Sequence, residues 1–154
     1  MRKIIILLCA LCFAVKGMCQ PHHGFSVKQV EPTFKNIDYA GDGLEGHLMD
    51  IYLPSDVKGK HKVIIAIYGS AWFANNMKSA AFFSIGKPLI DSGFAVVCIN
   101  HRSSGDAKFP AQIHDVKAAI RHLRANAGKY GLDTSFIGVT GFSSGGHLAS
   151  LAGV

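Results

Sequence analysis

A glycine-flanked serine near the end of the 154-residue chain is the feature best suited to covalent chemistry. Ser143 is the central residue of Gly141-Phe142-Ser143-Ser144-Gly145, which follows the apolar run Phe136–Thr140 and precedes a stretch of small residues that favours a helix. A strand, this pattern and a helix in succession form a nucleophile elbow, in which the serine hydroxyl projects from a sharp, strained turn. The spacing therefore predicts Ser143 as a nucleophile. The alternative is a glycine-rich turn with no catalytic role.

A serine that attacks a carbonyl group needs hydrogen-bond donors for the negative charge that develops on the carbonyl oxygen. Backbone N–H groups supply them, one from the residue after the nucleophile and others from the loop after an earlier strand. Ser144 follows the candidate nucleophile, and Ser70 and Ala71 lie in the loop after the apolar run Val63–Tyr68. We therefore predict an oxyanion hole made by the backbone amides of Ser144, Ser70 and Ala71.

The segments that position these residues alternate between strand-like and helix-like patterns. A β-hairpin followed by repeated strand–helix units predicts an α/β fold with a parallel sheet covered by helices on both faces. Because sites in such sheets form beyond the carboxyl ends of the strands, the loops Gly69–Phe73, His101–Pro110 and Gly141–Gly145 should converge. The predicted strands are Phe34–Tyr39, His47–Leu53, Val63–Tyr68, Phe94–Asn100 and Phe136–Thr140, and the predicted helices are Met77–Asp91, interrupted near Pro88, Ala111–Tyr130 and the stretch after the elbow.

The first 19 residues have the composition of a secretory signal peptide. A basic start, Met1-Arg2-Lys3, precedes the apolar run Ile4–Val15, which is too short to span a membrane, and small residues lie at Gly17 and Cys19. We expect cleavage after Cys19 and a secreted or periplasmic protein. A lipoprotein attached through Cys19 is the alternative form of export. Residues 20–33 are expected to be a flexible lead-in to a domain over residues 34–154.

The charge and the side chains of the remaining chain indicate neither nucleic-acid nor metal binding. Loss of residues 1–19 removes three basic residues and no acidic ones, which lowers the formal charge from +6 to +3. The remaining basic residues are scattered among acidic ones, so no nucleic-acid surface is expected. Cys98 lies in an apolar strand and is predicted to be a core residue. His101 and His114 lack the spacing of metal ligands, and we expect no metal or other cofactor.

Several motifs in the same order resemble the N-terminal half of an α/β-hydrolase, similar to the bacterial esterase/lipase group that includes acetyl esterases, acetylxylan esterases and feruloyl esterase-like members. In that group the third strand ends in H-G-G-G-W, and the nucleophile lies in G-x-S-A-G-G-H-L-A. Here Tyr68 replaces the histidine, and Ser70 and Ala71 replace the second and third glycines. The motifs that carry the resemblance are Tyr68-Gly69-Ser70-Ala71-Trp72, Asn100-His101-Arg102, Phe109-Pro110, Asp115 and Ser143–Ala149.

The resemblance implies a serine esterase that forms an acyl-enzyme on Ser143 and acts on small or carbohydrate-linked esters, such as acetylated or feruloylated carbohydrates. In the α/β-hydrolase order, the acid and the histidine of the catalytic triad follow the serine. Only 11 residues follow Ser143 here, so we expect the acid and the histidine to be missing from this chain. His147, one helical turn after Ser143, is a candidate base, but the resemblance places it at a helical packing position. Arg102 and Asp115 are predicted to be a structural pair between a strand end and a helix, with catalytic groups as the alternative.

Two other functions remain open at this point. A serine peptidase of the prolyl-oligopeptidase type shares the elbow and would cleave peptides instead of esters. A truncated or binding protein without catalytic activity would also carry the pattern, because no base for Ser143 is expected within these residues.

Overall fold

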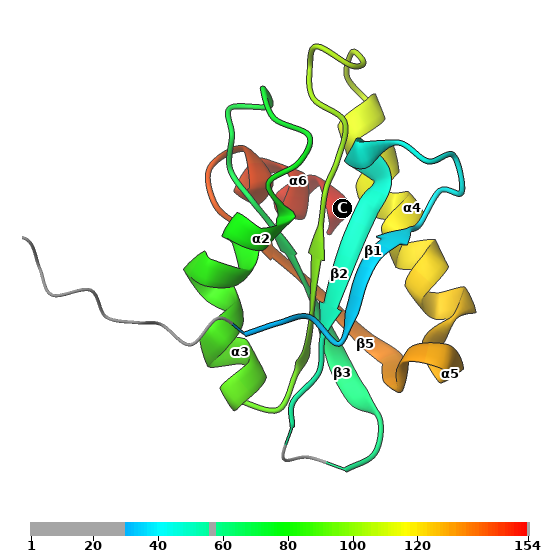
Figure 1. Ribbon diagram of the computed structural model, residues 1–154. Coiled ribbons are helices and arrows are strands. Elements are labelled where there is room, and N and C mark those ends of the chain that lie inside the picture. The colour runs from blue at the N-terminus through cyan, green and yellow to red at the C-terminus, as the bar shows by residue number, and fades with distance from the viewer. Residues whose placement is uncertain (1–29, 56–57, 154) are drawn as a thin grey trace, which may run out of the picture. The chain divides into compact units, whose positions relative to one another are not determined.

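The structure is a computed structural model that describes residues 30–55 and 58–153. The predicted signal peptide and residues 20–29 of the predicted lead-in therefore lie outside the described residues. The chain from Glu31 onward forms one unit, in which a twisted five-stranded sheet is flanked by helices (Figure 1). No helix among the described residues is long and apolar enough to cross a membrane.

The order of the elements is the predicted one, a hairpin followed by alternating strands and helices. The sheet order is β1-β2-β4-β3-β5. The strands are β1 (Phe34–Asp38), β2 (Leu48–Tyr52), β3 (His61–Ile67), β4 (Ala95–Ile99) and β5 (Leu132–Gly141). The helical segments are η2 (Glu45–His47), α2 (Lys78–Ala81), η3 (Phe82–Gly86), α3 (Lys87–Asp91), α4 (Ala111–Ala125), α5 (Ala127–Tyr130) and α6 (Ser144–Ala152).

The strand directions give a mostly parallel sheet with an antiparallel edge. β1 pairs antiparallel with β2, and β2 pairs antiparallel with β4. β3 lies between β4 and β5 and is parallel to both. The carboxyl ends of β3, β4 and β5 therefore lie at one edge of the sheet, where the predicted loops begin, and the predicted α/β fold is confirmed.

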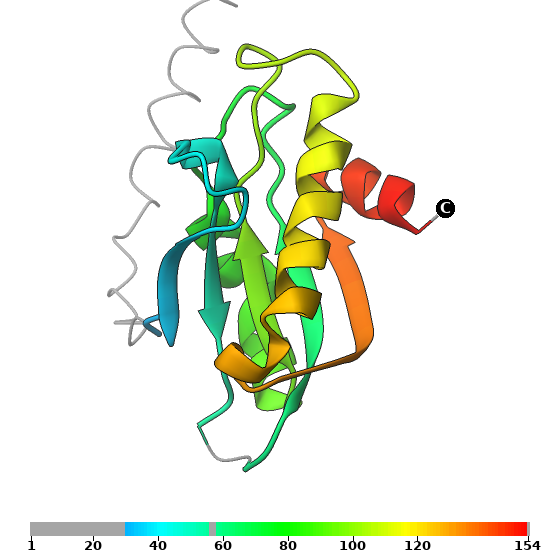
Figure 2. The same ribbon diagram turned by 90° about the vertical axis from the view of Figure 1, so that its right-hand side faces the viewer.

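Helices cover both faces of the sheet because alternate residues of its central strands point to opposite sides. Val63, Ile65 and Ile67 of β3 are fully or almost fully buried in the core under α4, α5 and α6. Ala66 and Tyr68 belong to a second apolar cluster, which includes Phe82 and packs under α2, η3 and α3. Figure 2 shows α4 and α6 on one side of the sheet and the α2–α3 segment on the other. Each large apolar side chain buried in this way contributes about 1.5–3 kcal/mol.

The helices differ from their predicted boundaries at two positions. The predicted helix Met77–Asp91 is interrupted by a π-helical segment, Phe82–Gly86, just before Pro88, which lacks an N–H group for the helical ladder. The predicted helix Ala111–Tyr130 is divided at Asn126, whose backbone leaves the helical region. Gly131 then ends α5 in the left-handed conformation that glycine adopts without strain.

β5 begins four residues earlier than the predicted strand, at Leu132 instead of Phe136. Leu132 pairs with His61 and Asp133 with Lys62, and a shift in register separates these pairs from the pairing of Val63 with Ile137. The Asp133 side chain accepts a hydrogen bond from the Ser135 amide within this irregularity, at 3.0 Å. The turn-forming residues thus lie in an irregular segment inside the strand and do not precede it.

Candidate active site

Ser143 lies at a sharp turn between β5 and α6, as the elbow pattern predicts. β5 ends at Gly141 and α6 begins at Ser144, so the chain reverses over Phe142 and Ser143, and Ser143 is strained, with φ 52° and ψ −122°. A non-glycine residue in such a conformation costs about 1–3 kcal/mol and persists only where the surroundings fix it. Ser143 is exposed, and its hydroxyl is therefore open to a substrate.

Close backbone packing at Gly141 and Gly145 fixes this turn. A Cβ atom at Gly145 would collide with the carbonyl oxygens of Ile67 and Tyr68, at the end of β3. A Cβ atom at Gly141 would collide with the backbone of Gly145 itself. The two glycines of the pattern are therefore required because the strand, the turn and the helix meet without space for a side chain.

The loop after β3, Gly69–Phe73, runs directly beside the elbow. A Cβ atom at Gly69 would lie 2.8 Å from the Ser143 Cβ atom and 2.6 Å from the Phe142 carbonyl oxygen. Ala71 and Trp72 follow with φ of 49° and 63°, in the left-handed region. Each such non-glycine residue costs about 1–2 kcal/mol, so the loop is held in a strained conformation next to the candidate nucleophile.

The predicted oxyanion donors lie in this region, but one of them already has an acceptor. The Ser70 amide donates a hydrogen bond of 3.0 Å to the Ser144 side-chain hydroxyl. The Ser144 and Ala71 amides have no hydrogen-bond acceptor among the described residues. Ser144 is the first residue of α6, where backbone N–H groups have no partner within the helix. The amides of Ser144 and Ala71 are therefore the ones free to bind an anionic oxygen.

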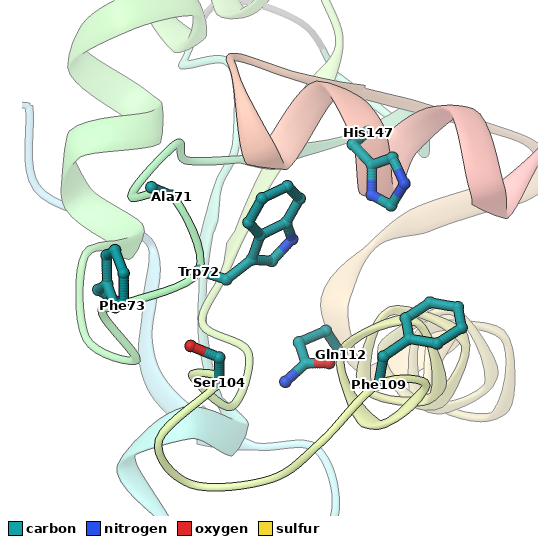
Figure 3. A pocket seen from close by; sticks show the side chains of 7 residues that line it. All are labelled: Ala71, Trp72, Phe73, Ser104, Phe109, Gln112 and His147. Atoms are coloured by element: carbon teal, nitrogen blue, oxygen red, sulfur yellow. The ribbon is translucent and has the colours of Figure 1, made fainter.

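The loop after β4 completes the convergence that the sequence predicts. The Ser104 amide donates a hydrogen bond of 2.7 Å to the Trp72 carbonyl oxygen, which ties the second loop to the first. A pocket of about 420 Å³ opens where they meet (Figure 3). It is lined by Ala71, Trp72, Phe73, Ser104, Phe109, Gln112 and His147. The pocket is large enough for a small ester and its lining is mainly aromatic.

His147 lies one helical turn after Ser143, but its ring is engaged elsewhere. Its backbone amide donates to the Ser143 carbonyl oxygen at 3.1 Å, as in a helix. The imidazole meets the Trp72 indole edge-on, with ring centroids 5.5 Å apart, as Figure 3 shows. Among the described residues, no histidine or carboxylate forms a hydrogen bond with the Ser143 hydroxyl.

Arg102 and Asp115 form the predicted ion pair between the end of β4 and helix α4. Arg102 Nη2 donates to Asp115 Oδ1 at 2.6 Å, and the Arg102 amide donates to Oδ2 at 2.9 Å. The Asp115 side chain is almost fully buried and also meets His47 Nε2 at 3.1 Å. Hydrogen bonding to Asp115 raises the pKa of Arg102. The pair orients the loop that supplies Ser104 and Phe109 to the pocket.

Tyr68 and His101 stack at the ends of β3 and β4, beneath these loops. Their ring centroids lie 4.9 Å apart, with the planes inclined by 13°. Burial raises the pKa of Tyr68 to about 12 and lowers the pKa of His101, so both are neutral at neutral pH. His101 Nε2 is the one buried side-chain nitrogen or oxygen of the described residues without a hydrogen-bond partner. The described residues contain no cluster of histidine, cysteine and carboxylate side chains that could hold a metal ion.

Some residues of the site were not predicted from the sequence. The role of the Ser144 hydroxyl depends on a contact with Ser70, 74 positions earlier in the chain, and no local pattern indicates it. Phe109 and Gln112 reach the pocket because α4 begins beside the first loop. Phe109 and Trp72 are large apolar residues in segments predicted to be loops, which is a signal that could have suggested a binding surface.

Comparison with known proteins connects this geometry with esterases. Residues 49–154 match the BD-FAE family. The chain is also 34% identical over 134 residues to Esterase LipQ of Mycobacterium tuberculosis, an alignment that covers 86% of this chain and 30% of that protein. The chain thus spans about a third or less of the length of the curated relatives that it matches.

Two solved structures are similar to this chain at higher sequence identity. A bifunctional GH43-CE protein of Bacteroides eggerthii is 73% identical, with a TM-score of 0.77, over 78% of this chain and 17% of that one. A truncated form of a carbohydrate esterase from gut microbiota is 61% identical, with a TM-score of 0.79, over 82% of this chain and 45% of that one.

Proposed function

Because the chain belongs to the BD-FAE family of α/β-hydrolase esterases, we propose that it carries the nucleophile of a carboxylic ester hydrolase, and that this nucleophile is Ser143. The observation that supports the proposal most directly is the backbone of Ser143, strained at φ 52° and exposed between β5 and α6. A turn of this kind presents a hydroxyl to substrate from a rigid support. The free amides of Ser144 and Ala71 lie in the two segments that form an oxyanion hole.

In the proposed reaction, Ser143 Oγ forms a bond to the carbonyl carbon of the ester, and its proton passes to a histidine base. The electron pair of the carbonyl moves to oxygen, where backbone amides stabilise the negative charge. Collapse of this intermediate breaks the bond to the alcohol, which takes the proton from the histidine and leaves an acyl-enzyme. Water then attacks the acyl group by the same route and releases the acid and Ser143.

We place the histidine and the acid of the triad outside residues 1–154. Two observations support this placement. No histidine or carboxylate of the described residues is hydrogen-bonded to Ser143, and the nearby His147 ring packs edge-on against Trp72. The triad order of α/β-hydrolases also puts both groups after the serine.

Carbohydrate-linked esters, such as acetylated or feruloylated carbohydrates, are the substrates that we propose. The pocket between the loops after β3 and β4 offers aromatic surfaces at Trp72, Phe73 and Phe109 together with the polar groups of Ser104 and Gln112. Aromatic faces with a few polar groups suit a sugar or an aromatic acyl group. The name of one similar structure, a carbohydrate esterase, agrees with this class. We also propose that the protein is exported by its first 19 residues, which N-terminal sequencing of the exported protein would test.

Ester hydrolysis is tested with the protein that contains this chain and a p-nitrophenyl acetate assay. We expect hydrolysis that Ser143→Ala abolishes and that Ser150→Ala, an exposed serine of the same helix, leaves unchanged. Intact-mass measurement with a phosphonate inhibitor should show one adduct, which is absent from Ser143→Ala. Cleavage of dipeptide anilides without ester hydrolysis would identify a peptidase instead. Absence of both activities and of the adduct would favour a protein without catalysis.

A further inference from the structure

We propose that the Ser144 hydroxyl is a positioning group, which holds the loop Gly69–Phe73 in the conformation that binds the oxyanion. The inference rests on the proposed ester hydrolysis at Ser143. It assigns two roles to Ser144, whose amide binds the oxyanion while its side chain fixes the loop that supplies the second donor. It also assigns to the Ser70 amide the role of an anchor and not of an oxyanion donor.

The loop needs an external contact because its own backbone is strained. Ala71 and Trp72 are consecutive non-glycine residues at φ 49° and 63°. Such conformations relax unless neighbouring groups hold them. The hydrogen bond from the Phe73 amide to the Ser70 carbonyl, 2.9 Å long, closes the turn but ties the loop only to itself.

Two hydrogen bonds connect the loop to the loop after β4 and to helix α6. At its far side the Trp72 carbonyl accepts from the Ser104 amide at 2.7 Å. At its near side the Ser70 amide donates to Ser144 Oγ at 3.0 Å. Among the described residues, the second is the hydrogen bond that joins the loop to helix α6. It is therefore the contact that sets the Ala71 amide at a fixed position relative to the Ser144 amide.

The surroundings of Ser144 suit an anchor and not a second nucleophile. Ser144 is 3% exposed, whereas the neighbouring residue Ser143 is exposed. A buried hydroxyl that accepts a hydrogen bond shields that bond from water, which strengthens it. The Ser144 side chain thus cannot be reached by substrate, and its effect on the reaction passes through the loop.

The test compares Ser144→Ala, Ala71→Gly and the double variant with wild type and with Ser150→Ala. Ser144→Ala removes the acceptor, and we expect kcat to fall about threefold to tenfold, the effect of one hydrogen bond, with KM nearly unchanged. Glycine at position 71 adopts a positive φ without strain, so Ala71→Gly should restore most of the lost kcat in the Ser144→Ala background. Binding of a boronic acid, which forms an anionic tetrahedral adduct, should weaken in parallel with kcat.

A purely structural role of Ser144 predicts a different pattern, in which thermal stability falls, KM rises and Ala71→Gly adds a further loss. That pattern, or an unchanged kcat in Ser144→Ala, would overturn the inference. Amide hydrogen exchange of the loop provides a readout that does not depend on activity. Ser70 should be protected in wild type and exchange faster in Ser144→Ala. If the wild-type protein hydrolyses no ester, the proposed function fails, and the exchange of Ser70 still decides whether the anchor exists.

Discussion

The Arg102 guanidinium donates hydrogen bonds to both oxygens of the Asp115 carboxylate, with Nη2 2.6 Å from Oδ1 and Nε 3.0 Å from Oδ2. The carboxylate side chain is 3% exposed and the guanidinium side chain 30% exposed. The pair therefore connects the loop after β4 to helix α4 through a buried carboxylate. The same carboxylate contacts His47 of η2, so one buried charge connects η2, the loop after β4 and helix α4.

Removal of this carboxylate should destabilise the protein strongly. For Asp115→Ala we expect a loss of about 3 kcal/mol in the free energy of unfolding, because Arg102 loses its partner and His47 keeps an unpaired buried nitrogen. The matched control is Asp91→Ala, which breaks an exposed pair with Lys87. That pair should contribute no more than about 0.5 kcal/mol. Urea unfolding measures both, and equal effects of the two variants would contradict the expectation.

A methyl group at Gly145 should prevent the elbow from closing. Its Cβ atom would meet the carbonyl oxygens of Ile67 and Tyr68, and backbone atoms cannot move aside as a side chain can. We expect Gly145→Ala to cost about 1–3 kcal/mol or more and to abolish labelling of Ser143 by a phosphonate. Gly128→Ala is the control, since nothing lies within 4 Å of the added atom. A Gly145→Ala protein with wild-type stability and labelling would show that the contact is not tight.

Protonation of His101 should make the folded protein sensitive to mild acid. Burial lowers the pKa of His101 in the folded state, although the Arg102 carbonyl and Asp115 oppose this effect. The unfolded chain binds the proton more readily, so the stability that His101 contributes is present above its ordinary pKa of about 6.5 and is lost as the pH falls below that value. The loss from this one group is at most about 1.4 kcal/mol per pH unit.

The variant His101→Phe keeps a ring against Tyr68 and cannot take up a proton. Its free energy of unfolding should therefore depend less on pH between about pH 7 and pH 5 than that of wild type. The control variant is His114→Gln, which replaces an exposed histidine. Parallel pH profiles for wild type and His101→Phe would contradict the expectation.

Cys98 should be inert in the folded protein. It is fully buried in β4, and burial raises the pKa of its thiol, so little of the reactive thiolate is present. We expect alkylation by iodoacetamide to follow the rate of unfolding, with rapid reaction only in urea. Peptide mass spectrometry measures the modification of Cys98 by itself. Complete labelling within minutes under native conditions would show that β4 opens readily.

The sequence was sufficient to predict the order of the elements and the position of Ser143, because both depend on local patterns. Val63–Tyr68 and Phe94–Asn100 are apolar runs that only a buried strand explains, and the glycines around Ser143 have fixed positions in the turn. The start of β5 was not predicted, because Leu132 and Asp133 become strand residues only through pairing with His61 and Lys62.

Contacts between distant segments account for the other differences. Ser70 was predicted as an oxyanion donor from its position alone. Its hydrogen bond to the Ser144 hydroxyl depends on how closely the loop and the elbow approach, which a single sequence does not specify.

The backbone contact between Gly145 and the end of β3 has a consequence for refolding. The strained turn at Ser143 can form only after β3, β5 and α6 have assembled, since isolated strand and helix residues would relax it. The Ser143 hydroxyl should therefore reach its native position late in refolding, after most of the secondary structure has formed. During refolding from urea, the circular dichroism signal would reach its native value before the reactivity of Ser143 toward a phosphonate does. The reactivity would therefore report when the last packing step is complete.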